Sequence, residues 1–413
     1  MQKLSCIIPA IFFLFSIQAQ PKTNKAVFII VDGIPADVIE KINKPALDEI
    51  SRAGGYTRAY VGGERGQYSE TPTISAVGYN SLLTGTWVNK HNVWDNDIKD
   101  PNYNYWNIFR LLETQQPQKK TAIFSTWEDN RTKLVGEGIA KAGNTRLDHH
   151  FDGMELDTIH YPHDAGSNYI HQIDEIVSDS AAAYIRRDGP DLSWVYLEYT
   201  DDMAHQHGDS KEFYTAVEMM DRQVGRIWRA IQYRQQNFNE SWQIFITTDH
   251  GRDSITGNNH GGQSTRERTT WIVTNAQGLN ARFKALPGIV DIMPTIAAHL
   301  GLTIPPDKLM EIDGVPLTGK LSATSLKAIS QNGKIHLQWE SIDKKGVVKI
   351  WLAITNQFKT GGKDHYQLIA TVPSDKEQFD IRLKDIPSSP LYKIVLEAPH
   401  NYLNTWIVVS SKN

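Results

Sequence analysis

Five short apolar runs recur along the first three quarters of the chain, and three of them end abruptly in acidic or imidazole side chains. The runs occupy residues 26–31 (AVFIIV), 121–125 (TAIFS), 194–199 (WVYLEY), 242–248 (WQIFITT) and 270–274 (TWIVT). Continuous β-branched and aromatic runs of this length are typical of strands buried on both faces of a mostly parallel sheet. Between them, residues 35–53 and 214–236 carry apolar side chains at three- and four-residue steps, which predicts helices. The alternation indicates a doubly wound α/β domain with helices on both faces of the sheet.

The pattern changes near residue 320. Six short segments between residues 335 and 410 read as strands separated by turn residues, and residues 347–355 alternate with a period of two. These features predict a small β-sandwich. The L-Q-W sequence at 337–339 resembles the second strand of a fibronectin type III module. We therefore expect an α/β domain over residues 21–320 and a fibronectin type III-like sandwich over 321–413.

The first twenty residues have the layout of a secretory signal peptide. Lys3 precedes an apolar run at 4–17, and cleavage is expected after Ala19 or Gln20. The run is too short for a membrane span, and no apolar stretch long enough to span a membrane follows it. The single cysteine, Cys6, lies in this leader, so the mature chain would have neither a disulfide nor a Cys-ligated metal. We expect a periplasmic or extracellular protein.

Charge and composition limit the classes of molecule that the protein could bind. The 43 basic and 47 acidic residues give a net charge of −4, without a long basic run. This balance argues against binding of a nucleic-acid duplex by bulk electrostatics. The 14 histidines leave a metal site of imidazole and carboxylate open. The oligomeric state cannot be predicted.

Candidate metal ligands lie where the predicted strands end. They are Asp32, Asp201, His205, Asp249, His250 and His260. One aspartate after a strand often only caps the next helix, but the carboxyl ends of parallel strands meet at one edge, where ligands bind. Nitrogen and oxygen ligands without sulfur suit zinc or another divalent transition metal. Six ligands are too many for one tetrahedral ion, and they predict two ions, an arrangement that serves phosphoryl transfer.

In this order the motifs resemble the alkaline phosphatase superfamily, most closely its nucleotide pyrophosphatase/phosphodiesterase branch, over about residues 25–320. The T-T-D-H-G motif at 247–251 is the sharpest of them. The resemblance implies an alkaline-phosphatase-like fold and a metal-dependent hydrolase of phosphate esters or nucleotides, with diesters preferred. It also implies two ligand sets, which are Asp32, Asp249 and His250 for one ion and Asp201, His205 and His260 for the other.

The nucleophile follows from the same resemblance. Family members place a Thr or Ser nine residues before the Thr of a T-G pair, and counting back from Thr84 gives Ser75, with Thr73 as the runner-up. Ser75 would also contact the first ion and form a phosphoseryl intermediate. A helix beginning just after Ser75 would aim its free N–H groups at a phosphoryl oxygen. The alternative is that Ser75 only caps that helix.

Substrate-binding residues are less well marked. The branch usually has Asn three residues after the nucleophile, where this chain has Gly78. Asn96 or Asn80 could replace that asparagine, and Arg131 or Lys133 lies where a phosphate-clamping cation would be expected. The sequence leaves these alternatives open.

Three other functions remain open. A phosphomonoesterase or a sulfatase-like ester hydrolase could use the same fold, although residues 76–79 (AVGY) lack the proline and arginine that follow the modified residue of sulfatases. A binding protein without catalytic activity is the third alternative. Comparison of sulfate, phosphate monoester and phosphate diester substrates would separate them.

Overall fold

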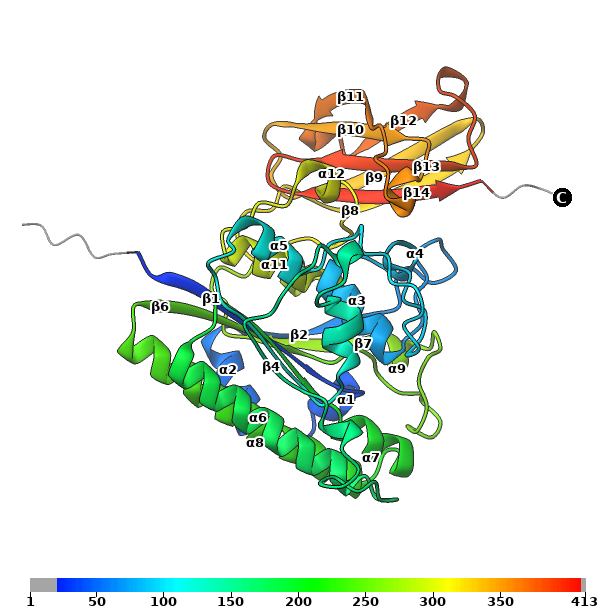
Figure 1. The fold of residues 1–413 in the computed structure, drawn as a ribbon. Helices are drawn as coiled ribbons and strands as arrows, with labels where there is room; N and C mark the ends of the chain where they lie inside the picture. The colour runs from blue at the N-terminus through cyan, green and yellow to red at the C-terminus, as the bar shows by residue number, and fades with distance from the viewer. Residues whose placement is uncertain (1–20, 410–413) are drawn as a thin grey trace, which may run out of the picture.

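The computed structural model describes residues 21–409, and its α/β part is built on one seven-stranded sheet in the order β2-β7-β6-β1-β5-β3-β4 (Figure 1). The strands are β1 (Thr23–Val31), β2 (Gly55–Tyr60), β3 (Thr121–Ser125), β4 (His149–Phe151), β5 (Leu192–Leu197), β6 (Glu240–Thr247) and β7 (Thr269–Thr274). Strand β1 pairs in parallel with β5 and β6, and β3 in parallel with β5 and β4. Only β7 runs antiparallel, to both β6 and β2. The mostly parallel sheet is therefore confirmed.

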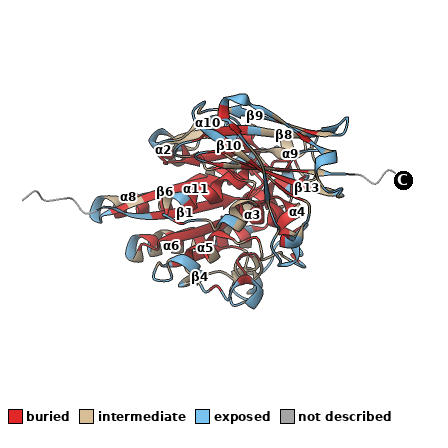
Figure 2. Cartoon of the chain, turned by 90° about the horizontal axis from the view of Figure 1, so that it is seen from above, coloured by how far each residue is buried: buried red, intermediate tan, exposed pale blue. Residues whose placement is uncertain are grey.

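Helices cover both faces of the sheet (Figures 1 and 2). They are α1 (Ala36–Ile39), α2 (Pro45–Ala53), α3 (Ser75–Thr84), α4 (Val88–His91), α5 (Ile108–Gln115), α6 (Asn168–Asp188), α7 (Tyr199–His207), α8 (Lys211–Asn237), α9 (Thr265–Arg268), α10 (Ala281–Lys284), α11 (Ile292–His299) and α12 (Pro306–Leu309). Strand β1 shows why helices must pack on both faces of the sheet. Phe28 and Ile30 join the core under α3, α5 and α11, whereas Ile29 and Val31 join the core under α2, α6 and α8. The doubly wound architecture is confirmed.

One helix prediction was wrong. The helix expected over 35–53 is two helices, because α1 ends at Ile39 and α2 begins at Pro45. Proline has no N–H group and its ring clashes with the preceding turn, so it breaks a helix but is well suited to the first helical position. The apolar residues keep a helical spacing on both sides of the break, so the spacing did not reveal it.

The C-terminal part is a β-sandwich, as expected for the fold class. Its two antiparallel sheets have the orders β11-β10-β13-β14 and β12-β9-β8. The strands are β8 (Ala323–Gln331), β9 (Lys334–Ser341), β10 (Val347–Ala353), β11 (Gln367–Pro373), β12 (Gln378–Arg382), β13 (Leu391–Glu397) and β14 (Tyr402–Val408). Side chains of both sheets, such as Trp339 and Ile350, share one core. Strand β8 was missed, because it is an edge strand whose second half is largely exposed and polar.

Three predictions concern the N-terminus, membrane-spanning helices and the division into domains. The predicted leader at 1–20 lies outside the described residues. Within residues 21–409, no helix is long and apolar enough to cross a membrane. The boundary near residue 320 and the likeness of the sandwich to fibronectin type III remain predictions.

Candidate active site

Three parallel strands bring the predicted ligands to one edge of the sheet. Strands β5, β1 and β6 are neighbours, and their carboxyl ends lie side by side. Asp32 follows β1 directly, and α7 begins two residues after β5. Asp201 and His205 lie one turn apart on α7, so the i, i+4 spacing places their side chains on the same helix face. The topology therefore gathers residues that are more than 200 positions apart in the sequence.

The first group of candidate ligands consists of Asp32, Asp249 and His250. Their ligand atoms lie within 4.8 Å of one another, and all three residues are buried. His250 Nε2 is 3.3 Å from Asp32 Oδ1 and 3.2 Å from Asp249 Oδ2. Neither of these two carboxylate oxygens has a hydrogen-bond partner. A buried acceptor left unsatisfied is costly, so the pair of oxygens indicates a place for a cation.

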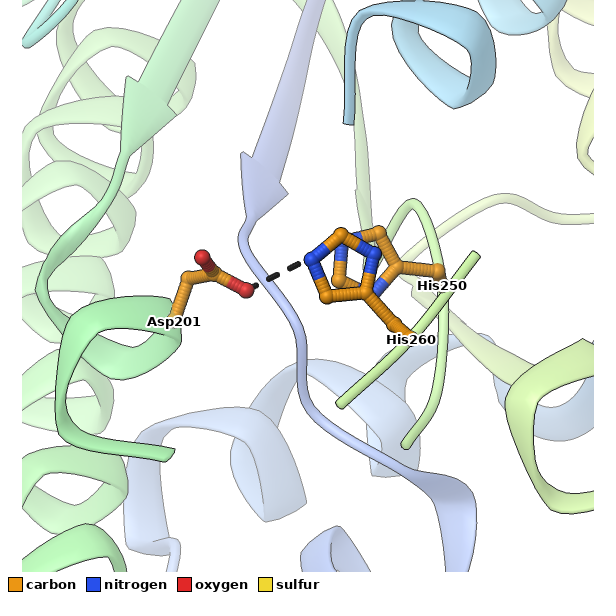
Figure 3. A group of neighbouring side chains, drawn as sticks. All are labelled: Asp201, His250 and His260. Carbon is orange, nitrogen blue, oxygen red and sulfur yellow. Dashed lines mark ion pairs between the residues drawn. The ribbon is translucent and has the colours of Figure 1, made fainter. Parts of the chain in front are cut away.

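The second group consists of Asp201, His250 and His260, again within 4.8 Å (Figure 3). Figure 3 shows the carboxylate of Asp201 opposite the two imidazoles, which stack with ring centroids 3.7 Å apart. His205 completes the predicted set, because its Nε2 lies 3.2 Å from Asp201 Oδ2 and 3.1 Å from His260 Nε2. The structure thus brings all six predicted ligands together, with His250 adjoining both groups.

Two of the histidines are held in the form that binds a metal. Nδ1 of His250 lies 2.9 Å from the carbonyl of Gly251, and Nδ1 of His260 lies 2.9 Å from that of Thr73. A carbonyl only accepts, so each Nδ1 carries the proton and each Nε2 presents its lone pair to the site. Burial also lowers the pKa of His260 to about 3, which keeps this ring neutral.

The carboxylates of the site differ in their electrostatics. Burial raises the pKa of Asp249 well above its usual value, and the charges of Asp32 and Asp201 raise it further. Burial also acts to raise the pKa of Asp201, but Arg252 and His205 outweigh it and hold this pKa low. Asp249 therefore lacks the compensating positive charge that Asp201 has. A divalent cation would supply it.

Ser75 is the first residue of α3, and its hydroxyl faces the ligands. Ser75 Oγ lies 3.3 Å from His250 Nε2. The hydroxyl of Thr73 is already engaged, because it donates to the carbonyl of Gly262 at 2.8 Å and accepts from the N–H of Gly261 at 3.0 Å. Of the two candidate nucleophiles, Ser75 is thus the one whose oxygen points at the candidate metal site.

Asn96 lies beside the nucleophile. Its Oδ1 accepts a hydrogen bond from the N–H of Ala76 at 3.0 Å, and the residue is exposed. Gly78, where an asparagine was expected, is explained by packing. A Cβ there would lie 2.7 Å from the carbonyl oxygen of Asp249, so a larger residue would push α3 away from that ligand.

A sequence model described as "Type I phosphodiesterase / nucleotide pyrophosphatase" matches residues 26–378. The chain belongs to this family. The match takes in the α/β part and much of the sandwich. It confirms the resemblance to the alkaline phosphatase superfamily and its phosphodiesterase branch.

Relatives of this phosphodiesterase-family chain share shorter segments. The 2,3-bisphosphoglycerate-independent phosphoglycerate mutase of Mesomycoplasma hyopneumoniae (strain 7448) is 31% identical over 29% of this chain and 22% of its own length. Venom phosphodiesterase CdcPDE of Crotalus durissus collilineatus is 22% identical over 54% of this chain and 26% of its own length. The chain thus spans about a quarter of the length of these curated relatives.

Among solved structures, the phosphonate monoester hydrolase of Agrobacterium radiobacter is similar in fold. Its TM-score is 0.51 at 12% identity, over 94% of this chain and 89% of that one. This likeness supports the alkaline-phosphatase-like architecture of the family member described here.

Sequence reasoning missed three side chains that hold the ligands. Tyr196 donates to Asp32 Oδ2 at 2.7 Å, and Tyr79 donates to the same oxygen, which leaves Oδ1 free. Arg252 is fully buried, contacts the carboxylate of Asp201 and donates to the Gly33 carbonyl at 3.2 Å. Arg252 directly follows the T-T-D-H-G motif, and that position was the available signal.

The candidate phosphate clamp at 131–133 is engaged elsewhere. Arg131 forms ion pairs with Asp152 at 2.7 Å, Glu137 at 2.9 Å and Glu128 at 3.1 Å. Lys133 Nζ pairs with Asp129 at 2.7 Å, and its side chain is half-buried. Arg131 is therefore not free to bind a phosphate of the substrate, and Lys133 already has a carboxylate partner.

Proposed function

We propose that this chain is a hydrolase of phosphate esters that uses two divalent metal ions and prefers diesters to monoesters. The observation that carries the proposal is the Ser75 hydroxyl, 3.3 Å from Nε2 of the histidine that adjoins both ligand groups. Membership of the phosphodiesterase family supports the same class of reaction. We further propose that the protein acts after export, in the periplasm or outside the cell.

The donor set fits zinc. The free oxygens of Asp32 and Asp249 and the unprotonated Nε2 of His250 are of the kind that zinc binds, and we assign them to one ion. We assign Asp201, His205 and His260 to the other ion, supported by the short distances among them. When bound, such a pair of ions activates an oxygen nucleophile and stabilises charge on attacking and leaving oxygens.

Ser75 is the proposed nucleophile. Its Oγ would attack phosphorus in line with the leaving oxygen, so that the Oγ–P bond forms while the bond to the leaving group breaks. The serine proton ends on the departing alcohol, and a phosphoseryl intermediate remains. Water then attacks the same phosphorus, releases the product and restores the serine. Two in-line steps give net retention of configuration at phosphorus.

Two features at the start of α3 would orient the substrate. Helix N-termini bind phosphoryl oxygens through their backbone N–H groups. The Asn96 side chain contacts this terminus through Ala76 and is exposed, so its amide NH₂ is available to a second oxygen. The nearby arginines are occupied, Arg131 by three carboxylates and Arg252 by Asp201. With both arginines engaged, neither can offset the extra charge of a monoester, which favours a diester.

Two variants test the nucleophile. Ser75→Ala is expected to lower kcat by on the order of a thousand-fold or more while the metal content stays the same. Thr73→Ala is the matched control, because it removes a hydroxyl from the same segment. An active Ser75→Ala protein together with an inactive Thr73→Ala protein would contradict the assignment.

A substrate panel tests the class of reaction. Rates on bis-p-nitrophenyl phosphate, p-nitrophenyl phosphate and p-nitrophenyl sulfate share one coloured product, so they can be compared directly. We expect the diester to be hydrolysed fastest. Faster hydrolysis of the sulfate or the monoester would replace the proposal with one of the rival activities, and no hydrolysis of any ester would favour a binding protein.

Sequencing of the N-terminus after expression would test cleavage near residue 20.

A further inference from the structure

A groove of about 1050 Å³ lies between the α/β part and the sandwich. One wall comes from residues 63–68 and 263–269 of the α/β part. The other comes from β8 and β14, on the side of the sandwich that faces the α/β part (Figure 1). Ile329 of β8 and Val408 of β14 line this wall, and each is 57% exposed. Exposed apolar side chains gathered in a groove are typical of a surface that a partner covers.

The edge of β8 opens into this groove. Asn401 joins the starts of the two strands, because its Oδ1 accepts from the N–H groups of Ser322 and Ala323. Farther along, β8 pairs with β9 and β14 pairs with β13, but the two strands form no ladder with each other. Successive side chains of a strand point to opposite faces, yet every residue from 325 to 330 lines the groove. The groove therefore follows the unpaired edge of β8, which can accept an added strand.

Three cations line the groove without an ionic partner. They are Arg65, Arg268 and Lys327, against one acidic side chain, Glu64. Within residues 21–409, the ion pairs do not include any of the three cations. Arg268 is also held in place, because its guanidinium donates to the carbonyls of Val61 at 3.3 Å and Gly63 at 2.5 Å. A lysine on an open edge discourages most strands from pairing, so this edge favours a strand that carries carboxylates.

The two faces of β8 differ and specify the pattern of such a strand. Leu326 and Ala328 are half-buried and pack against the sandwich core. Lys327 and Ile329 alternate with them and are exposed. Side chains of adjacent strands share a face. A strand beside β8 should therefore alternate apolar residues toward the core with carboxylates toward the cations.

The aromatic rings of the groove are already engaged. Tyr68 stacks on Trp406 with ring centroids 5.3 Å apart, and Tyr60 packs against Trp87 at 5.5 Å. Single-stranded nucleic acid depends on aromatic faces on which its bases stack, in addition to cations. The open strand edge and the half-buried apolar side chains instead favour a polypeptide.

We propose that this groove binds an extended, acidic segment of a partner polypeptide, which adds as a strand to the edge of β8. Main-chain hydrogen bonds to β8 hold the segment, and its carboxylates pair with Arg268, Lys327 and Arg65. Its apolar side chains extend the core beside Leu326 and Ala328. The inference does not depend on the reaction at Ser75, and it makes the sandwich a module that captures a protein partner.

Two peptides of opposite charge test the proposal. A fluorescent peptide of alternating valine and glutamate, about eight residues long to span β8 at about 3.3 Å per residue, is titrated with the whole protein and followed by anisotropy. The valine–lysine peptide is the control probe. We expect the glutamate peptide to bind at least about ten-fold more tightly than the lysine peptide. Equal binding, or no binding of the glutamate peptide, would overturn the proposal.

Variants locate the binding surface. Arg268→Gln and Lys327→Glu should each weaken binding of the glutamate peptide about ten-fold, as for loss of a charged hydrogen bond. Lys384→Glu is the matched control, because Lys384 is an exposed lysine of the sandwich outside the groove. It should bind the peptide as the unaltered protein does. Equal weakening in all three variants would show attraction by overall charge and would overturn the groove as the site.

Modified peptides test strand addition itself. N-methylation of all valines, or of all glutamates, removes the N–H groups along one edge of the peptide and keeps every side chain and charge. One of these two peptides should bind at least about ten-fold more weakly, because only one edge faces β8. Unchanged binding of both would overturn strand addition. Tighter binding of an oligothymidylate of equal charge than of the glutamate peptide would show a nucleic-acid site instead and would overturn the proposal.

Discussion

Two clusters of buried charges in this molecule are balanced in opposite ways. The first lies where the α/β part meets the sandwich, and its two lysines are fully buried. Lys90 Nζ lies 2.6 Å from Asp313, and Lys393 Nζ lies 2.7 Å from Asp364 and also contacts Glu311. Each lysine thus has a carboxylate at contact distance, and each of the three carboxylates has a lysine.

The second cluster, at the carboxyl edge of the sheet, lacks that balance. Within residues 21–409, Asp32 and Asp249 have no lysine or arginine partner, and one oxygen of each faces Nε2 of His250. Both keep an oxygen without a hydrogen bond. The comparison teaches that burial of charge by itself does not mark a functional site. What distinguishes the candidate site is its deficit of positive charge.

The largest effect is expected from Asp249→Asn. Loss of one ligand should lower kcat about a thousand-fold, since a bound metal supplies several kcal/mol of transition-state stabilisation. The metal-free variant should nevertheless be more stable than the metal-free parent, because burial and the charges of Asp32 and Asp201 raise the pKa of Asp249. Urea unfolding after dialysis against a chelator measures the stability. A less stable metal-free variant would show that the charge is already balanced.

Lys393→Met should act in the opposite direction at the interface. Glu311 and Asp364 would be left buried without their partner, which costs about 3–5 kcal/mol of the free energy of unfolding. Urea unfolding measures the loss, with Lys384→Met, at an exposed position of the same sandwich, as the control. If both variants lose less than about 1 kcal/mol, the value typical of a surface pair, the interface cluster is not a matched network.

A smaller effect is expected from Tyr79→Phe. The ring remains, but the hydrogen bond to Asp32 Oδ2 is lost, and removal of such a support typically weakens metal binding about 10- to 100-fold. Tyr105→Phe is the matched control, because the buried hydroxyl of Tyr105 has no hydrogen-bond partner. Zinc affinities of both variants, measured by competition with a chelating dye, check the expectation. Equal affinities would mean that the tyrosine does not position the ligand.

The smallest effect concerns His91, a buried group kept neutral without a counter-charge. Burial lowers its pKa to about 3, and its Nδ1 accepts from the N–H of Val93 at 3.1 Å. The unfolded chain binds a proton near pH 6.5, the folded chain only near pH 3, so stability falls as the pH drops between these values. The slope is at most about 1.4 kcal/mol per pH unit.

Replacement of this histidine should flatten the acid limb of the stability profile. His91→Gln removes the titrating ring, and His365→Gln at an exposed position serves as the control. Urea unfolding at pH 7, 6 and 5 compares the slopes. An unchanged slope in His91→Gln would show that the ring titrates freely in the folded protein.

The sequence revealed the candidate ligands but not their environment. Asp32, Asp201 and Asp249 could be found because each interrupts an apolar pattern at a strand end, and parallel pairing then brings such ends together. Arg252 and Tyr196 interrupt nothing, and their contacts with Asp201 and Asp32 depend on long-range packing. Whether a buried oxygen keeps a free lone pair depends on such contacts. The lack of a hydrogen-bond partner at one oxygen of Asp32 and of Asp249 therefore became visible only in the structure.

The secondary structure shows the same limit. The period of two identified β10, because its buried residues alternate, but not β8, whose exposed second half offers no contrast. The apolar spacing over 35–53 was correct for both helices and gave no sign of the break before Pro45. Local sequence patterns reveal which residues are buried. They fail at an exposed edge strand such as β8 and at the helix break before Pro45, because burial does not mark these places.

We propose that two metal ions make up the charge deficit at the sheet edge and serve Ser75. The most direct measurement is activity on bis-p-nitrophenyl phosphate as zinc is added back to protein freed of metal. We expect the metal-free protein to be inactive, and its activity to rise with added zinc and level off at about two ions per chain. A metal-free protein that retains full activity would contradict it.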